Sequence, residues 1–197
     1  MKRALLVGID RYPRGSLIGC VADATAANEL LARNADGNAN WTTNVITSDN
    51  TDPITRDVLR RAIYKLFENA RDYDLLFFFA GHGARTPWGA ELVTEDFTEF
   101  SLGVSMHDLI TLANESPARS VTIMLDCCFS GATGSIPGTQ AGAVADSFRL
   151  THATLRENVT IMAASRGTET SKESGGHGAF TRVLLDGLSG GATDHLG

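Results

Sequence analysis

The clearest pattern along this chain is a pair of short apolar runs, each followed at once by small and polar residues. The first run covers residues 75–80 and is followed by Gly-His-Gly at 81–83. The second covers residues 121–125 and is followed by Asp-Cys-Cys at 126–128. A strand buried on both faces has such a pattern, as in a parallel sheet covered by helices. Because open α/β sheets bind ligands just beyond the carboxyl ends of their strands, we predict that His82 and the cysteine pair lie at the functional edge of a sheet.

Elsewhere the chain alternates between strand-like and helix-like patterns. Further apolar runs predict strands over residues 4–9, 45–47 and 159–164. Apolar positions at helical spacing predict helices over residues 24–33, from 51–53 to 67, over 105–114 and over 179–188. Loops are expected at residues 84–98 and in the Gly- and Pro-rich linker 132–144. This alternation predicts an α/β fold with a mainly parallel central sheet and helices on both faces.

Composition and charge narrow the class of protein. The 197 residues suit one domain, and a hydrophobic fraction of 43% is enough for a substantial core. The formal net charge of −6 argues against a nucleic-acid partner. No apolar run approaches the roughly 18 residues of a membrane span, and Asp10 ends the first run too early for a signal peptide. We therefore expect a cytoplasmic protein that binds neither nucleic acid nor membrane.

The cysteine content points to a reactive thiol rather than to a structural bridge or a metal site. The chain has three cysteines, two of them adjacent, which suits neither a disulfide framework nor a zinc site. Cys20 and Cys127 are expected to be buried as small apolar residues, whereas Cys128 begins a turn rich in small residues. A thiol beside an imidazole can lose its proton to it, and the thiolate is then the nucleophile. The strand ends that carry His82 and the cysteine pair are expected to supply such a dyad.

The residues around these two strand ends resemble the caspase-like cysteine peptidases, most closely the metacaspases and the bacterial orthocaspases. The resemblance is carried by Phe-Ala-Gly-His-Gly at 79–83, followed by Leu-Asp-Cys-Cys-Phe-Ser-Gly at 125–131. Other segments that resemble the family in the same order are 4–9, 17–24, 163–165 and 178–181. The resemblance implies a caspase-like three-layer sandwich and an endopeptidase that acts on protein or peptide substrates.

The same resemblance implies one domain over residues 1–197 with two halves. Residues 1–131 resemble the large subunit, residues 132–158 the linker between subunits, and residues 159–197 the small subunit. Because the chain stops soon after its last predicted helix, we expect it to be part of a longer protein with further domains or an activating partner.

The resemblance also implies roles for individual residues. His82 would be the general base and Cys128 the nucleophile. The backbone N–H groups of Gly83 and Cys128 would form the oxyanion hole. Asp23 and Asp126 would line the substrate pocket and select Arg or Lys before the scissile bond, since a carboxylate pairs well with a guanidinium.

The two pocket aspartates have structural alternatives, and the pocket itself departs from the family pattern. Asp23 stands where it would cap helix 24–33, and Asp126 stands where loop N–H groups would satisfy its carboxylate. Ala80 occupies a position where metacaspases usually carry a serine of the same pocket, so one polar contact is missing.

No cofactor or metal site is predicted. Many metacaspases carry an acidic loop that binds calcium, and such a loop is not evident after His82. The acidic residues in that region lack the spacing of calcium ligands: Glu91, Glu95, Asp96 and Glu99. The sequence therefore shows no clear ligand cluster that would support calcium activation.

Caspase-like enzymes are often cut between their two halves, which makes self-cleavage a further expectation. Arg149 and Arg156 are the candidate positions before the cleaved bond. Two other functions are alternatives to the peptidase. One is a regulatory or protein-binding module on the same fold with little or no activity. The other is a nucleotide-binding α/β protein, which would need a Gly-rich phosphate loop that the chain lacks.

Overall fold

Alternating strands and helices make up the computed structural model, which describes residues 1–128, 155–164 and 178–191. The strands are β1 (Lys2–Gly8), β2 (Thr42–Thr47), β3 (Asp74–Thr86), β4 (Gly89–Thr98), β5 (Ser101–Ser105), β6 (Ser120–Cys128) and β7 (Val159–Ala163). The helices are α1 (Cys20–Ala32), α2 (Arg56–Phe67), α3 (Met106–Glu115) and α5 (Ala179–Asp186), and an irregular turn at Gly187–Gly191 follows α5. The predicted linker 132–158 lies outside the described residues except for 155–158.

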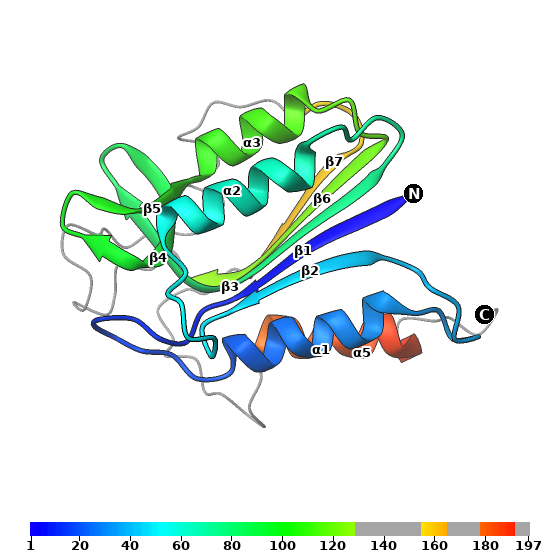
Figure 1. Ribbon diagram of the computed structural model, residues 1–197, viewed down its shortest axis with the longest axis horizontal. Helices are drawn as coiled ribbons and strands as arrows, with labels where there is room; N and C mark the ends of the chain where they lie inside the picture. Colours follow the sequence, from blue (N-terminus) through cyan, green and yellow to red (C-terminus); the bar gives the residue numbers. More distant parts are fainter. Residues whose placement is uncertain (129–154, 165–177, 192–197) are drawn as a thin grey trace.

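The seven strands form one sheet with a parallel and an antiparallel part (Figure 1). β2, β1, β3, β6 and β7 lie side by side in that order, and each neighbouring pair is parallel. β4 pairs antiparallel with the end of β3, and β5 pairs antiparallel with β4. The switch falls within β3, because residues 74–82 pair with β6 and residues 83–86 pair with β4. His82 is therefore the last residue of β3 on the parallel side.

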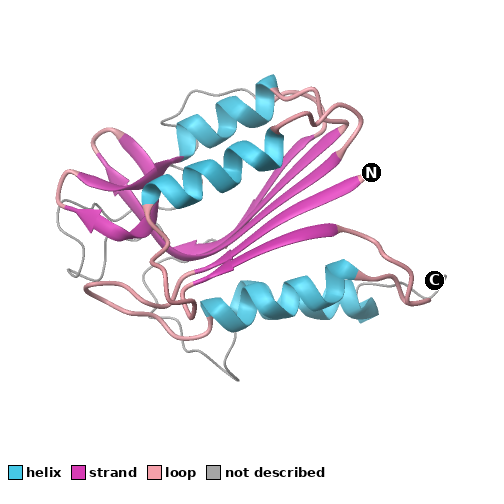
Figure 2. Ribbon diagram, viewed as in Figure 1, coloured by secondary structure: helices cyan, strands magenta, loops and turns pink. Residues whose placement is uncertain are grey.

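Helices cover both faces of the parallel part of the sheet (Figure 2). α2 and α3 lie on one face, and α1 and α5 lie on the other. A sheet between two helical layers buries both of its faces, which is why its strands are apolar at nearly every position. The predicted α/β three-layer architecture is confirmed.

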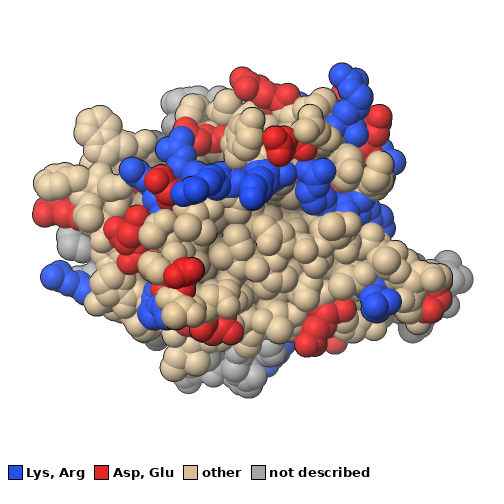
Figure 3. Space-filling model, viewed as in Figure 1, with Lys and Arg blue, Asp and Glu red and all other residues tan. Residues whose placement is uncertain are grey.

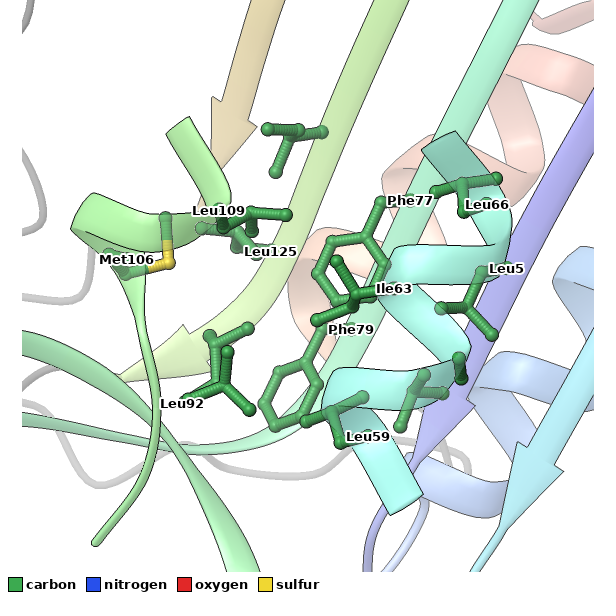
Figure 4. Packing of buried hydrophobic residues seen from close by; sticks show 14 of the residues in the cluster. Leu5, Leu59, Ile63, Leu66, Phe77, Phe79, Leu92, Met106, Leu109 and Leu125 are labelled. Atoms are coloured by element: carbon green, nitrogen blue, oxygen red, sulfur yellow. The ribbon is translucent and has the colours of Figure 1, made fainter. Parts of the chain in front are cut away.

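Three consecutive phenylalanines show how β3 serves both faces. Phe77, Phe78 and Phe79 have no exposed surface. Successive side chains of a strand point to opposite faces. Phe77 and Phe79 accordingly pack in the core that includes Leu59 and Ile63 of α2 (Figure 4), whereas Phe78 belongs to the core beside α1. Since truncating such a side chain to alanine costs about 3–5 kcal/mol, β3 stabilises both halves of the sandwich.

The antiparallel part of the sheet corrects one prediction. Residues 84–98, predicted as a loop, form the end of β3 and all of β4. Leu92 is fully buried, and Gly103 of β5 lies so close that a Cβ there would overlap the Leu92 carbonyl oxygen. Thr94 and Glu95 are buried polar residues whose hydrogen bonds replace those to water. Buried polar residues with partners hide the alternation by which a strand is predicted.

The start of α1 also differs from the prediction. The helix begins at Cys20 rather than at Ala24, because the carboxylate of Asp10 accepts the N–H of Cys20 at 2.8 Å and that of Val21 at 3.3 Å. An acceptor at the first turn satisfies N–H groups that have no partner within the helix. Asp23 lies inside the helix, so the expectation that it is the N-cap is wrong.

Side chains next to their own helices cap α2 and α3. α2 begins at Arg56 rather than near residues 51–53, since the hydroxyl of Thr55 accepts the N–H of Val58 at 3.3 Å. The hydroxyl of Ser105 accepts the N–H of His107 at 3.2 Å, which confirms the predicted start of α3.

α2 is strongly amphipathic, as predicted. Figure 3 shows a strip of basic side chains along this helix. Its exposed basic residues are Arg56, Arg60, Arg61 and Lys65. Its buried face carries Leu59, Ile63 and Leu66. Among the described residues, no helix has the length and apolar character required to cross a membrane.

Candidate active site

His82 and Cys128 meet at the carboxyl edge of the parallel sheet. They are register partners at the last pairing of β3 with β6. Neighbouring strands lie roughly 4.8 Å apart, so the two backbone positions are immediate neighbours. Gly83, the next residue of β3, pairs with Leu92 of β4. The two motifs that stand far apart in the sequence are thus brought to one point of the sheet.

The imidazole of His82 is held by a backbone carbonyl from another loop. Its Nε2 lies 2.6 Å from the carbonyl oxygen of Gly15, in the loop between β1 and α1. A carbonyl oxygen can only accept a hydrogen bond, so Nε2 carries the proton. In the neutral ring Nδ1 then has the lone pair that can take up a proton.

Burial keeps this imidazole neutral. The half-buried environment lowers the pKa of His82 below its usual 6.5, and the hydrogen bond to Gly15 opposes this shift only in part. At neutral pH the ring is therefore in the form that a general base requires.

Tyr12, in the same loop as Gly15, contacts both the ring and the backbone of His82. The two ring centroids are 4.6 Å apart with the planes tilted by 50°. The Tyr12 hydroxyl accepts the backbone N–H of His82 at 2.9 Å. Burial raises the pKa of Tyr12 well above its usual value of 10, so the phenol stays protonated.

Sequence reasoning missed Tyr12 and Gly15. One signal was available, because the loop after β1 leaves the same edge of the sheet as the ends of β3 and β6. Loops at that edge converge on one site in open α/β sheets. The particular contacts could not be foreseen, since Gly15 and His82 are 67 residues apart and their distance depends on the whole β1–β3 pairing.

Asp23 and Asp126 lie together at the N-terminus of α5. Asp23 is almost fully buried, and its Oδ2 accepts the N–H of Gly178 at 3.1 Å. Oδ2 of Asp126 accepts the N–H of Thr181 at 3.1 Å and its hydroxyl at 2.6 Å. A Cβ on Gly178 would overlap the carboxylate of Asp126 and lie 3.2 Å from that of Asp23. Two acidic side chains from α1 and β6 therefore lie beside the same glycine of a third segment.

The other two cysteines are buried. Cys20 and Cys127 are 9% and 2% exposed, as predicted for small apolar residues. Burial, followed by the nearby charge of Asp10, raises the pKa of the Cys20 thiol far above its usual value. The Cys20 thiol is therefore not a nucleophile at neutral pH.

The acidic side chains of β4 accept hydrogen bonds from backbone N–H groups of neighbouring segments. Glu91 accepts the N–H of Gly103 at 3.0 Å, and Asp96 accepts that of Arg56 at 2.9 Å. The buried Glu95 accepts the N–H of Ile54 and forms an ion pair with Arg11. Across the described ranges, no group of three or more His, Cys, Asp or Glu side chains is placed to hold a metal ion.

Of the two candidate self-cleavage positions, only Arg156 lies among the described residues. Its guanidinium donates to the carbonyl oxygens of Ala118 at 2.9 Å and Ala113 at 3.3 Å. Its backbone N–H donates to the side chain of Asn114 at 3.0 Å. Arg156 thus anchors the segment before β7 against the end of α3.

The protein has an α/β fold, and a candidate histidine–cysteine site lies at the carboxyl ends of two of its parallel strands. The sequence profile of the caspase domain matches residues 1–197, and the chain belongs to this family. Membership indicates cysteine-type peptidase activity on protein or peptide substrates.

Comparison with solved structures supports the fold. The crystal structure of protein GSU0716 from Geobacter sulfurreducens is similar with a TM-score of 0.65 and 16% sequence identity. The similarity covers 98% of this chain and 83% of that one. The comparison with curated proteins finds no match.

Proposed function

We propose that this protein is a cysteine endopeptidase of the metacaspase or orthocaspase type that cleaves after Arg or Lys. Cys128 is the nucleophile and His82 the general base. The observation that carries the proposal is the register pairing of these two residues at the carboxyl edge, with Nε2 of His82 held by Gly15. That hydrogen bond leaves Nδ1 as the basic nitrogen of a neutral ring.

The chemistry follows from these groups. Nδ1 of His82 takes the thiol proton of Cys128, and the thiolate attacks the scissile carbonyl carbon. The negative charge that develops on the carbonyl oxygen is stabilised by the backbone N–H groups of Gly83 and Cys128. His82 then protonates the leaving amine as the C–N bond breaks, which leaves a thioester. A water molecule, deprotonated by His82, hydrolyses the thioester and regenerates the thiol.

The specificity is assigned to the two aspartates at Gly178. A guanidinium or ammonium group entering beside them would meet two carboxylates in a largely buried setting, where charge-assisted hydrogen bonds are strong. Asp23 and Asp126 also hold the first turn of α5. A bound Arg or Lys must therefore share these carboxylates with that turn.

Further parts of the proposal concern activation and location. Self-cleavage after Arg149 or Arg156 is proposed as a maturation step, and no cofactor is required for the chemistry. Since the mechanism depends on a reduced thiol, the cytoplasm is the proposed location.

A panel of fluorogenic peptides with Arg, Lys or Asp before the scissile bond tests the proposal. We expect cleavage after Arg and Lys, and a loss of at least about 10³-fold in kcat/KM for Cys128→Ala and for His82→Ala. Cys20→Ala is the matched control and retains activity, because its buried thiol takes no part. The panel is run with and without calcium.

Three results would contradict the proposal in different ways. Cleavage that persists in Cys128→Ala would show that Cys128 is not the nucleophile. Cleavage after Asp would be consistent with the dyad but would contradict the roles assigned to Asp23 and Asp126. Silence with every peptide, together with a Cys128 that alkylates no faster than Cys20, would favour a regulatory module.

A further inference from the structure

We propose that Tyr12 is a positioning residue that holds the His82 imidazole in its productive orientation through its hydroxyl and its ring. This inference rests on the proposed function, since it assigns His82 the role of base. Tyr12 would touch neither the substrate nor the attacking thiol.

The first support is that Tyr12 contacts His82 in two independent ways. The hydroxyl accepts the backbone N–H of His82 at 2.9 Å, and the two rings pack 4.6 Å apart. The N–H contact fixes the backbone at the point where β3 leaves β6, and the ring contact limits rotation of the imidazole. Tyr12 is only 5% exposed, so neither contact competes with water.

The second support is that the same loop provides the acceptor for Nε2. Gly15 stands three positions after Tyr12, with a φ of 70° that glycine adopts without strain. Its carbonyl oxygen lies 2.6 Å from Nε2 of His82. The hydroxyl of Tyr12 therefore holds residues 12–15, whose Gly15 carbonyl orients the imidazole, against β3.

The rest of this loop is anchored without Tyr12. The hydroxyl of Ser48 accepts the N–H groups of Asp10 and Arg11, at 2.8 and 3.2 Å. The N–H of Leu17 donates to the carbonyl of Asp10 at 2.8 Å. Loss of the Tyr12 hydroxyl should therefore loosen residues 12–15 and the His82 ring and leave the two ends of the loop in place.

The third support is the space beside Gly81. A Cβ at that position would stand 2.6 Å from the Tyr12 hydroxyl and 3.0 Å from the ring of Phe79. Real Cβ atoms do not approach other atoms so closely, so any larger residue would push Tyr12 away from His82. The glycine that precedes the histidine is thus explained by the tyrosine that lies over it.

The deciding experiment compares Tyr12→Phe with Tyr73→Phe in the full chain. Tyr12→Phe removes only the hydroxyl, which accepts the N–H of His82 and also donates to the carbonyl oxygen of Val93 at 3.4 Å. We expect kcat to fall about tenfold with KM within about twofold, as for the loss of the bond to His82. Tyr73 is a partly buried tyrosine whose ring packs on Arg3, and Tyr73→Phe should match the wild type. An unchanged kcat in Tyr12→Phe would overturn the inference.

A second readout does not depend on peptidase activity. The ¹⁵N chemical shifts of the His82 ring, assigned with His82→Gln, report which nitrogen carries the proton. We expect the Nε2-protonated form in the wild type and in Tyr73→Phe, and a mixture of both forms in Tyr12→Phe. If no peptide is cleaved, the proposed function fails while this spectrum still decides the role of Tyr12. A Tyr12→Phe spectrum identical to that of the wild type overturns it.

Gly81→Ala gives an independent test should Tyr12→Phe fail to fold. The new methyl group displaces the Tyr12 hydroxyl, so both the tautomer mixture and a loss of kcat are expected. In the double variant, Gly81→Ala with Tyr12→Phe, the new methyl group no longer meets a hydroxyl. The combined fold-loss in kcat should therefore be smaller than the product of the two single fold-losses. Multiplicative losses would mean that Gly81 and Tyr12 act separately, which contradicts the inference.

Discussion

His82 is the residue on which opposing effects meet. Burial disfavours its charged form, whereas the Gly15 carbonyl stabilises a proton on Nε2. The first effect is the larger, so the ring is neutral at a pH where a free imidazole would already be partly charged. A base that stays neutral at a pH below the usual pKa of imidazole can accept a proton from a thiol in mildly acidic solution.

The pH dependence of activity should reflect this shift. We expect the acid limb of kcat/KM for an Arg substrate to have its midpoint below 6.5, the usual pKa of the imidazole. Between the lowered folded pKa and 6.5 the unfolded chain binds more protons, so the free energy of unfolding decreases as pH falls through that window. Both effects are measured by kinetics and by thermal unfolding across mildly acidic pH.

His82→Gln is the control for the stability part. The variant lacks the titrating ring, so its unfolding should lose the component of pH dependence in that window. An acid limb at or above 6.5 would contradict the lowered pKa of His82.

At the scale of elements, two helices take their first-turn acceptors from distant segments. Asp10, after β1, accepts from the first turn of α1, and Asp126, at the end of β6, accepts from the first turn of α5. Neither helix has a side-chain cap of its own. α2 and α3, on the other face, use Thr55 and Ser105 next to them in sequence. The helices of the α1 and α5 layer are therefore coupled to the strand ends where the site lies.

Asp126 should consequently serve stability and specificity at once. Asp126→Ala removes the acceptor for two bonds from Thr181 and should lower the free energy of unfolding by about 1–2 kcal/mol. Asp126→Asn keeps an acceptor but removes the charge. It should retain most of the stability while lowering kcat/KM for Arg substrates at least about tenfold.

Thr181→Val is the matched control, because it removes one hydrogen bond and leaves the Asp126 charge in place. It should lower stability without altering the preference for Arg. Chemical denaturation and the peptide panel together separate the two roles. An Asp126→Asn variant with unchanged Arg cleavage would show that Asp126 is structural only.

At the scale of the whole molecule, the residues of the candidate site come from three strands, or the loops after them, at one edge of the sheet. β1 supplies the loop with Tyr12 and Gly15, β3 supplies His82, and β6 supplies Asp126 and Cys128. Because all three strands are parallel and adjacent, their carboxyl ends lie together. β4 and β5 continue the sheet beyond this edge, where β3 leaves its pairing with β6.

The proposed self-cleavage belongs to this scale. Arg156 is tied by its guanidinium to the carbonyls of Ala113 and Ala118, and cleavage after it would first require those bonds to break. We therefore expect cleavage after Arg149 in preference to Arg156. Mass spectrometry of the purified chain should find the new terminus after Arg149, and Cys128→Ala should remain intact.

Arg149→Gln and Arg156→Gln are the matched variants for this prediction. The first should block cleavage and the second should not. Equal cutting of the wild type and of Cys128→Ala would instead assign the cut to another protease.

Several features of this protein are determined by local sequence alone. The three consecutive apolar residues Phe77, Phe78 and Phe79 predict that β3 is buried on both faces, because a strand alternates its side chains between two faces. The start of α3 follows from Ser105, since a capping hydroxyl acts within a few residues of its own position. Such features depend on backbone geometry over a few residues, and the alternation of these elements was sufficient to predict the fold class.

The remaining features were decided only by tertiary structure. Asp23 and Gly178 are 155 residues apart in the chain, and Tyr12 and His82 are 70 apart. β4 was not predicted because its buried polar residues, Thr94 and Glu95, find hydrogen-bond partners in other segments. A hydrogen bond across such separations depends on strand order and register, which no local pattern encodes. The sequence alone therefore determined which residues are proposed to carry the chemistry, whereas the pairing of β1, β3 and β6 decided which groups lie around them.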